Sequence, residues 1–446
     1  MFEKFRPPLF LVTSLGWLAL SVLLGLSVWI AKELGFPHPP QLRVIHVHMA
    51  LVGGVTQMIF GAMLTFIPPL LMTTFTPAHP SRAETRPFPS EEKKRRGFQY
   101  FLLNGGAVGM LVGFGVSDLT VVGFAGAAVG LAFLMLFSET LRMVRTSVQR
   151  TGLNLWFYGL AALALFAGIG LAELIAFGAL LPDSVNLARL AHLHLNLMGF
   201  VTLTIVGTMH NLFPTVAGSR LYSDRLAMAA FASLPLGILA LVGGFILAAP
   251  LFQIVAGFVL LAGVLCYGWN ILRTWLAAET RFPLPVLHLL SATGWLAVTI
   301  AAGIFLSWNS RTDPPEFPTG TAHLMGYSHM ALVGFILQTI MGAISHLLPV
   351  ILTLNRVKSQ KKRRPYLDQL TALVERGKWV QLAALNLGTA GMMGWGLSAG
   401  LFGLQAGPTV ATLWLSAALL LTGLGVFAVK LGRLLTLQPV KDKEGD

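Results

Sequence analysis

The chain has 446 residues, of which 55% are hydrophobic and only 11% are charged, and its formal net charge is +13. Soluble domains carry about a quarter charged residues, so this composition excludes a soluble globular protein and indicates an integral membrane protein. The single cysteine, Cys266, excludes an intrachain disulfide, covalent haem attachment through C-x-x-C-H and a cysteine-ligated zinc or iron–sulfur site.

Twelve apolar runs approach the roughly 20 residues that a membrane-spanning helix needs. They predict an all-α protein with twelve transmembrane helices in one membrane domain, residues 1–446. The first run has no A-x-A cleavage site, so we expect a retained helix rather than a signal peptide. The runs lie near 9–31, 46–72, 98–118, 120–141, 155–181, 189–214, 226–249, 251–275, 284–307, 321–354, 379–402 and 408–434.

The basic residues are distributed unevenly between the segments that join these runs. With the amino terminus placed inside, all but four of the 31 Lys and Arg fall on the inner side, many of them in EEKKRR (91–96) and RVKSQKKRRP (356–365). This positive-inside pattern predicts a multi-pass protein of a bacterial-type cytoplasmic (inner) membrane with both termini cytoplasmic. Because the bases are spread over all the inner loops, we expect no nucleic-acid partner. The four outer bases are Lys32, Arg43, Arg189 and Arg311.

One pattern occurs three times, on the second, sixth and tenth of the predicted helices. In each case a histidine is followed by Gly at +5, Gly at +13 and Pro at +20, without a gap. The stretches are HVHMALVGGVTQMIFGAMLTFIP (46–68), HLHLNLMGFVTLTIVGTMHNLFP (192–214) and YSHMALVGFILQTIMGAISHLLP (327–349). The register indicates three pseudo-symmetric repeats of four helices, about 1–150, 151–280 and 281–446.

The repeated small residues have a physical interpretation. Glycine suits the close approach of another helix or of a flat ring, and the proline is expected to mark the inner end of each helix. The positions are Gly53, Gly199 and Gly334 at +5, Gly61, Gly207 and Gly342 at +13, and Pro68, Pro214 and Pro349 at +20.

The histidines from which the pattern is counted, His48, His194 and His329, are here called the anchor histidines. Two are doubled in H-x-H, by His46 and His192. Residues i and i+2 of a helix are about 200° apart, so one helix can direct the two imidazoles of H-x-H to two different sites. Intramembrane ionisable residues are functional candidates and imidazole is a common metal ligand. The alternative is that these histidines only pack at interfaces or between helices.

Arginine precedes each H-x-H by three residues, in RVIHVH (43–48) and RLAHLH (189–194). Arg43 and Arg189 would therefore lie on nearly the same face as a histidine, one turn nearer the outer water. A planar guanidinium suits the carboxylates of haem propionates, which favours haem over a bare metal. The alternative is a snorkelling arginine at a helix end. The third repeat departs from the pattern, with Leu324 in this position and His323 beside it.

Twelve helices with histidines on helices two, six and ten resemble subunit I of the haem–copper oxidases and nitric oxide reductases. HLHLNLMG (192–199) is similar to that superfamily's H-x-H-x-x-x-M-G, although the superfamily carries it on helix ten. FPTVAGSRLYSDRLA (213–227) resembles the P-x-x-x-G-r-x-l-Y-S-x-x-L-A loop of its C-family oxidases and nitric oxide reductases. FRPPLFLV (5–12), with the first HVH, resembles the NnrS-type haem–copper membrane proteins linked to nitric oxide tolerance.

The resemblance implies ligands at particular positions of this chain. His48 and His329 match the two axial ligands of the superfamily's low-spin haem, and His194 matches its helix-six copper ligand. Tyr327 stands where a histidine would hold the high-spin haem; it is either a ligand of ferric haem, as tyrosine is in catalase, or a packing residue.

Helix seven, RLAMAAFASLPLGILALVGGFILAA (225–249), lacks the histidine pair that the superfamily's copper needs. A standard oxygen-reducing centre is therefore not expected. His46 and His192 offer replacement ligands for a second haem or for copper.

Further polar residues lie inside the predicted helices. His210 and His346 are expected at a similar inner depth, where they would form a metal or quinol site or pack at helix ends. Glu173 is the one acid of its helix and is interpreted as a proton carrier or as a hydrogen-bonded structural carboxylate. His288 begins its helix and is expected to face the interface.

Together these features predict a membrane haem redox protein, with at least one haem b and with copper as an option, that acts on or binds nitric oxide or oxygen. If it is an enzyme, it is an oxidoreductase of the nitric oxide reductase or terminal oxidase type with a non-standard active site. The alternative is a non-enzymatic haem or copper protein for nitric oxide tolerance or metal handling. The expected partners are the lipid bilayer, a small diatomic ligand and an external electron donor, cytochrome c or quinol. A transporter fits less well, because transporters commonly show twofold repeats.

Overall fold

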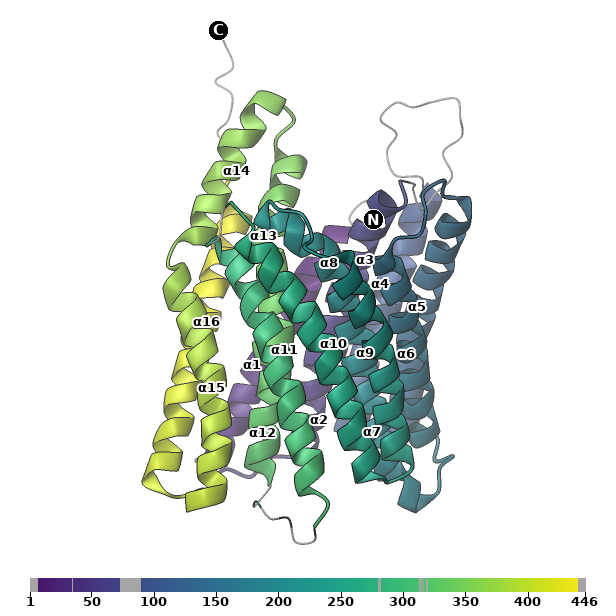
Figure 1. Ribbon diagram of the computed structural model, residues 1–446, viewed down its shortest axis with the longest axis vertical. Helices are drawn as coiled ribbons and strands as arrows, with labels where there is room; N and C mark the ends of the chain where they lie inside the picture. Colours follow the sequence, from purple (N-terminus) through teal and green to yellow (C-terminus); the bar gives the residue numbers. More distant parts are fainter. Residues whose placement is uncertain are drawn as a thin grey trace. The chain divides into compact units, whose positions relative to one another are not determined.

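Helices are the regular elements of the chain (Figure 1). The computed structural model describes residues 7–33, 35–72, 90–279, 282–312, 315, 317 and 320–439, and these contain no β-strand. Both ends of the chain, including Phe5 and Arg6 of the FRPPLFLV stretch, lie outside the described residues. The α-helices are α1 (Pro7–Glu33), α2 (Gln41–His48), α3 (Gln57–Leu70), α4 (Ser90–Gly115), α5 (Leu119–Thr146), α6 (Leu153–Ala176), α7 (Val185–His194), α8 (Leu203–Ala217), α9 (Asp224–Ile246), α10 (Pro250–Leu276), α11 (Leu284–Asn309), α12 (Thr321–His329), α13 (Gln338–Arg356), α14 (Gln360–Glu375), α15 (Lys378–Phe402) and α16 (Gly407–Thr436).

Eleven helical segments of the described chain are long and apolar enough to cross a membrane. This confirms the predicted all-helical, multi-pass membrane protein. The predicted run at 379–402 corresponds to α15, which has 25 residues but is less apolar because it carries Gln381 and Asn386 among many glycines. The predicted count of twelve spans therefore depends on whether α15 crosses the membrane.

α14 was not predicted as a helix. The segment RVKSQKKRRP was interpreted as part of an inner loop because of its charge, but residues 360–375 form a helix of 16 residues that buries Tyr366, Leu370 and Val374 on one side. Spacings of four residues place these three side chains on one face, and the basic residues occupy the remainder.

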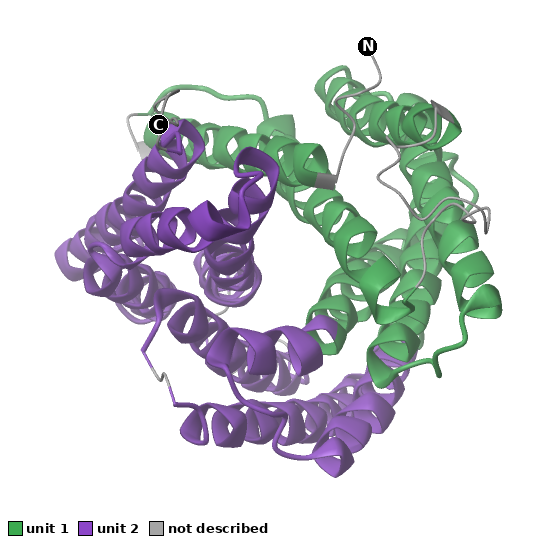
Figure 2. Ribbon diagram, turned by 90° about the horizontal axis from the view of Figure 1, so that it is seen from above, with its two compact units in different colours: residues 1–207, 245–248 green, residues 208–244, 249–446 purple. Residues whose placement is uncertain are grey.

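The chain divides into two compact units (Figure 2). Unit 1 comprises Met1–Gly207 and Phe245–Ala248, and unit 2 comprises Thr208–Gly244 and Ala249–Asp446. The first repeat lies in unit 1, and the third repeat lies in unit 2.

Each anchor histidine is followed directly by a π-helix of eight residues. The three are η2 (Met49–Thr56), η4 (Leu195–Thr202) and η5 (Met330–Leu337). They join α2 to α3, α7 to α8 and α12 to α13. π-Helices are rare and occur frequently at functional sites. A π-helix occurs at the same position in all three repeats, so the residues beside the anchor histidines form a candidate functional region.

Five of the repeated glycines pack closely against side chains from the first helix of their own repeat. At each of these five positions, an added β-carbon would lie 2.6–3.0 Å from such a side chain. The contacts are Gly53 with Trp17, Gly61 with Phe10 and Leu11, Gly207 with Phe157, Gly334 with Trp295, and Gly342 with Leu289. Of the two interpretations given to these glycines, close helix packing holds at these five positions and space for a flat ring does not.

Two of the three prolines at +20 mark the end of a helix, as the sequence predicts. Pro68 and Pro214 lie in the last turn of α3 and α8, whereas Pro349 lies two turns before the end of α13. α13 continues through Pro349 because its later residues pack inward, among them Leu352 and Thr353.

The glycine packing leads to a prediction for Gly342→Ala. Its β-carbon would meet the Leu289 side chain at 2.8 Å and the Pro285 carbonyl oxygen at 3.0 Å, so the helices must separate at a cost of about 1–3 kcal/mol. We expect a lower thermal unfolding temperature of the detergent-purified protein.

Gly432→Ala is the matched control, because nothing lies within 4 Å of its added β-carbon. This variant should be neutral or more stable, since Ala favours a helix over Gly by about 1 kcal/mol. Equal stability of the two variants would contradict the packing assignment.

Candidate functional site

The anchor histidines share one hydrogen-bonding arrangement. Nδ1 of His48 donates to the carbonyl of Val44 at 2.9 Å, that of His194 to Leu190 at 2.8 Å, and that of His329 to Met325 at 2.8 Å. Each acceptor is four residues earlier on the same helix. A neutral imidazole with its proton on Nδ1 has its lone pair on Nε2, which is the nitrogen that can ligate a metal.

The doubling histidines bond in another direction. Nδ1 of His46 donates to the carbonyl of Ser21 on α1 at 2.8 Å, and Nδ1 of His192 donates to the carbonyl of Gly168 on α6 at 2.8 Å. Both acceptors belong to the first helix of the same repeat. The two rings of each H-x-H therefore have different surroundings, as the 200° step predicts, and both doubling histidines also keep Nε2 as the nitrogen with the lone pair.

Unit 1 contains four of the predicted site residues on two helical segments, His46 and His48 on one and His192 and His194 on the other. The ring of His48 packs on Phe114 of α4 with centroids 4.6 Å apart, and that of His194 packs on Phe245 at 4.5 Å. One imidazole of each H-x-H thus packs on an aromatic ring.

The third repeat places Tyr327 where the first places His46. The Tyr327 hydroxyl lies against Gly303 of α11, 3.0 Å from an added β-carbon, just as the His46 ring lies against Gly25 of α1, 2.6 Å from one. Tyr327 thus extends along the first helix of its own repeat, which favours the packing interpretation. His48 belongs to unit 1, whereas His329 and Tyr327 belong to unit 2.

The remaining predicted residues have varied surroundings. Arg43 and Arg189 are exposed, which suits either interpretation given to them. His210 is buried, its ring edge-on to Tyr267 with centroids 5.8 Å apart, and His346 is half-buried. Within the described ranges, no three His, Cys, Asp or Glu side chains are grouped so that they could hold a metal ion.

Glu173 lies against two glycines of α5. Its Oε1 would be 2.8 Å from a β-carbon at Gly126 and its Oε2 3.0 Å from one at Gly123. The buried Oε2 has no hydrogen-bond partner among the described residues. The position of Glu173 against these two glycines is compatible with both interpretations, a proton carrier and a structural carboxylate.

The loop that resembles the C-family motif is fixed to the end of α10. Backbone N–H of Tyr222 donates to Oγ1 of Thr274 at 3.1 Å, and the backbone of Ser223 forms two hydrogen bonds with the Asn270 amide, at 2.8 and 2.9 Å. The Arg273 guanidinium lies over the Tyr222 ring, 4.6 Å from its centroid. The Y-S pair of the motif therefore has a structural role in closing this loop.

A hydrogen-bonded chain of buried polar side chains crosses unit 2, and the sequence did not reveal it. Lys430 donates to Gln381 at 2.7 Å, and the Gln381 amide donates to Nε2 of His288 at 2.9 Å. Nδ1 of His288 donates to Gln338 at 3.1 Å, and Gln338 donates to Asn386 at 3.2 Å. His288 was expected to face the interface, but it is fully buried, because both of its ring nitrogens have amide partners on neighbouring helices.

The direction of every bond in this chain follows from the lysine. An ammonium can only donate, so Gln381 must present its oxygen to Lys430 and its nitrogen to His288. His288 is consequently neutral, with its proton on Nδ1. Trp295 completes the group by donating to Asn386 at 2.7 Å.

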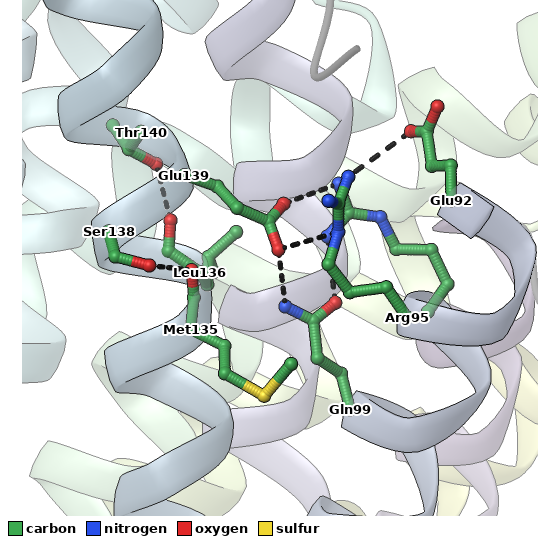
Figure 3. A network of polar contacts seen from close by, with 9 residues as sticks. Glu92, Arg95, Gln99, Met135, Leu136, Ser138, Glu139 and Thr140 are labelled. Carbon is green, nitrogen blue, oxygen red and sulfur yellow. Dashed lines mark hydrogen bonds and ion pairs between the residues drawn. The ribbon is translucent and has the colours of Figure 1, made fainter.

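Unit 1 contains a counterpart built around a buried ion-pair cluster (Figure 3). Trp17 donates to Asn104 at 2.9 Å, and five residues before Asn104 the Gln99 amide donates to Glu139 at 3.1 Å and accepts from Arg96 at 2.7 Å. Glu139 pairs with Arg95 at 2.9 Å and with the fully buried Arg96 at 2.7 Å. In both repeats a Trp donates to Asn and the Gln oxygen accepts from a buried cation, Arg96 in the first and Lys430 in the third.

A signal for these residues was present in the sequence. Q-x-x-x-x-N occurs as 99–104 and 381–386, and Gln stands at +9 from two anchors, as Gln57 and Gln338. The amide of Gln57 is buried and has no hydrogen-bond partner among the described residues. Extending the repeat alignment beyond histidine, glycine and proline would have identified this group.

Comparison with known proteins supports the fold. No protein-family model matches the chain, and no curated protein matches it. A similar solved structure is that of a heme-copper terminal oxidase dimer determined by cryo-EM, with a TM-score of 0.72 over 98% of this chain and 85% of that chain, at 12% sequence identity. The chain therefore has the haem–copper oxidase superfamily fold, like subunit I, as the resemblance implied. At this identity the likeness shows the fold alone.

The ion-pair cluster of unit 1 leads to a prediction for Glu139→Gln. This substitution removes the carboxylate that lies 2.9 Å from Arg95 and 2.7 Å from the buried Arg96, and leaves only Glu92 at 3.7 Å from Arg96. Removing one member of a buried ion pair costs about 3–5 kcal/mol. We expect a marked fall in the thermal unfolding temperature.

Glu92→Gln is the control, because Glu92 lies 3.7 Å from Arg96, beyond hydrogen-bonding distance. It should have a clearly smaller effect on the unfolding temperature. Equal losses in the two variants would show that Glu139 is not the principal counter-charge.

Proposed function

We propose that the protein is a membrane haem redox protein that acts on or binds nitric oxide or oxygen, with at least one haem b. The observation that carries this proposal is the shared state of the anchor histidines. Each has Nδ1 bonded to a backbone carbonyl and its lone pair on Nε2, and each precedes a π-helix. The superfamily fold supplies the second support.

Each ring of the proposed axial pair, His48 of unit 1 and His329 of unit 2, is in the state that an axial imidazole needs, with its proton on Nδ1. We propose that these two residues would hold the haem, as the resemblance implies, and the haem would supply reversible one-electron transfer when bound. The carbonyls of Val44 and Met325 keep each proton on Nδ1 and orient each ring, which is the usual contribution of such partners to a metal ligand. Arg43, exposed one turn from the doubling histidine, would pair with a propionate.

The second site is proposed to differ from a standard haem–copper centre. α9 carries no histidine in the segment that resembles helix seven, and Tyr327 points along α11. His46, His192 and His194 remain as ligands for a second haem or for copper. The electrons would come from an external donor, cytochrome c or quinol.

A non-enzymatic role in nitric oxide tolerance or metal handling is the second candidate. It is favoured by the sequence of helix seven, which supplies no histidine for a standard oxygen-reducing centre. For either role we propose the inner membrane of a bacterial-type cell, with both termini cytoplasmic, because that orientation satisfies the positive-inside pattern.

The axial pair is tested by His48→Ala and His329→Ala. The purified wild-type protein should show the Soret band of a six-coordinate, bis-imidazole haem in its oxidised and dithionite-reduced spectra. Each substitution removes one ligand, so each should yield a high-spin haem that reacts with carbon monoxide, or should lose the haem. Arg43→Gln is the matched variant, which changes the charge near the propionates and should shift only the midpoint potential.

Two results would contradict this assignment. A colourless preparation from haem-replete cells would show that no haem binds. Retention of the bis-imidazole spectrum in both alanine variants would exclude His48 and His329 as the pair, and His46 and His192 would then be the next ligands to replace.

Copper is tested separately on helix six, by metal analysis of His192→Ala and His194→Ala. If copper is present, we expect replacement of His192 and His194 together to remove it stoichiometrically while the haem spectrum is retained. His346→Ala, on a different repeat, is the control and should leave the copper content unchanged. Copper that persists in the double helix-six variant would refute this placement.

A further inference from the structure

A groove between α14 and α16 combines apolar walls with three cations. It has a volume of about 400 Å³ and is open on one side. Arg376, Lys430 and Arg433 line it together with apolar side chains that include Leu373, Val426 and Val429. We propose that this groove binds an anionic phospholipid of the inner leaflet, with the phosphate among the three cations and an acyl chain along α16.

Two of the three cations, Arg376 and Arg433, are exposed and form no ion pair in the described part of the chain. Lys430 is buried, donates to the neutral amide oxygen of Gln381 at 2.7 Å and lies within the field of Glu375. Glu375 itself pairs with Lys378 at 2.8 Å and accepts from the backbone of Leu284 at 2.8 Å. A phosphate would therefore supply the anion that Arg376 and Arg433 lack.

The length of the groove suits a lipid. Its residues on α16 extend from Leu421 to Arg433, which corresponds to about 18 Å of helix rise, close to half of a hydrocarbon core of about 30 Å. Val429 and Leu421 are exposed, so the apolar part faces the surroundings of the helix, while Arg433 is near its carboxyl-terminal end. An inorganic phosphate would leave this apolar part uncovered, whereas a phospholipid would cover it.

The location agrees with the charge pattern. α14 carries the basic run that the positive-inside rule assigns to the cytoplasmic side, and that leaflet contains the anionic lipids which basic grooves beside transmembrane helices bind.

The proposal is tested by measuring phosphatidylglycerol binding to the full-length protein in detergent by native mass spectrometry. Arg376→Gln with Arg433→Gln should weaken binding at least about tenfold, since each basic residue near an anionic headgroup contributes about a factor of five. Lys361→Gln with Arg364→Gln is the matched control. It removes the same charge from exposed positions of α14 that do not line the groove, and it should bind like wild type.

A second pair of variants tests the acyl chain without changing charge. Gly425 lines the groove and Gly432 does not, and nothing lies within 4 Å of a β-carbon added at either position. Gly425→Leu should fill the groove and weaken binding, whereas Gly432→Leu should not.

Three results would overturn the proposal. Equal binding by the groove variants and their controls would show that the lipid does not occupy the groove. Equal binding of phosphatidylcholine would show that the cations do not select an anion. Displacement of phosphatidylglycerol by millimolar inorganic phosphate would show a site for free anions instead.

Discussion

An N–H group in hydrocarbon has no water to accept its proton, and this constraint governs the histidines of the protein. Five of them meet it with a backbone carbonyl, from their own helix or from the first helix of the same repeat. Each carbonyl fixes the tautomer and the direction of the ring. The arrangement that makes an imidazole tolerable in the membrane thus also leaves the other nitrogen ready for a metal.

The same constraint explains the buried polar clusters of the first and third repeats. A buried charge needs an oriented partner, and in both units a glutamine oxygen supplies one, accepting from Lys430 in one and from Arg96 in the other. Because an amide also has a donor end, the nitrogen of the same side chain can bond a further group, which is His288 in unit 2 and Glu139 in unit 1. The two repeats thus share the role of the glutamine oxygen and differ in the partner of its nitrogen.

The sequence predicted those features that depend on local composition and spacing. Apolar runs reveal helices, and the periodic glycines revealed where the helices of one repeat approach each other, as Gly53 and Gly334 do with tryptophans. α14 was missed because its charge was interpreted as a loop signal. The polar chain was missed because the repeats were aligned on histidine, glycine and proline only, although Gln338 and the Gln381–Asn386 pair recur in the first repeat as Gln57 and Gln99–Asn104. The π-helices were missed because a change in hydrogen-bond register leaves no mark in hydropathy.

The π-helices also affect how these segments tolerate insertion and deletion. An extra residue in one helical turn changes the angular phase of everything beyond it by about 100°. In each repeat, the glycine at +13 packs the helix that follows the π-helix against the first helix of the repeat. The direction in which the histidines before the π-helix point is therefore set by the number of residues between them and that glycine. Loss of a single residue from η2, η4 or η5 would restore an ordinary helix and keep every side chain of the anchor, yet turn its imidazole by roughly a quarter of a circle. In these three segments, length is therefore under tighter constraint than the identity of most residues.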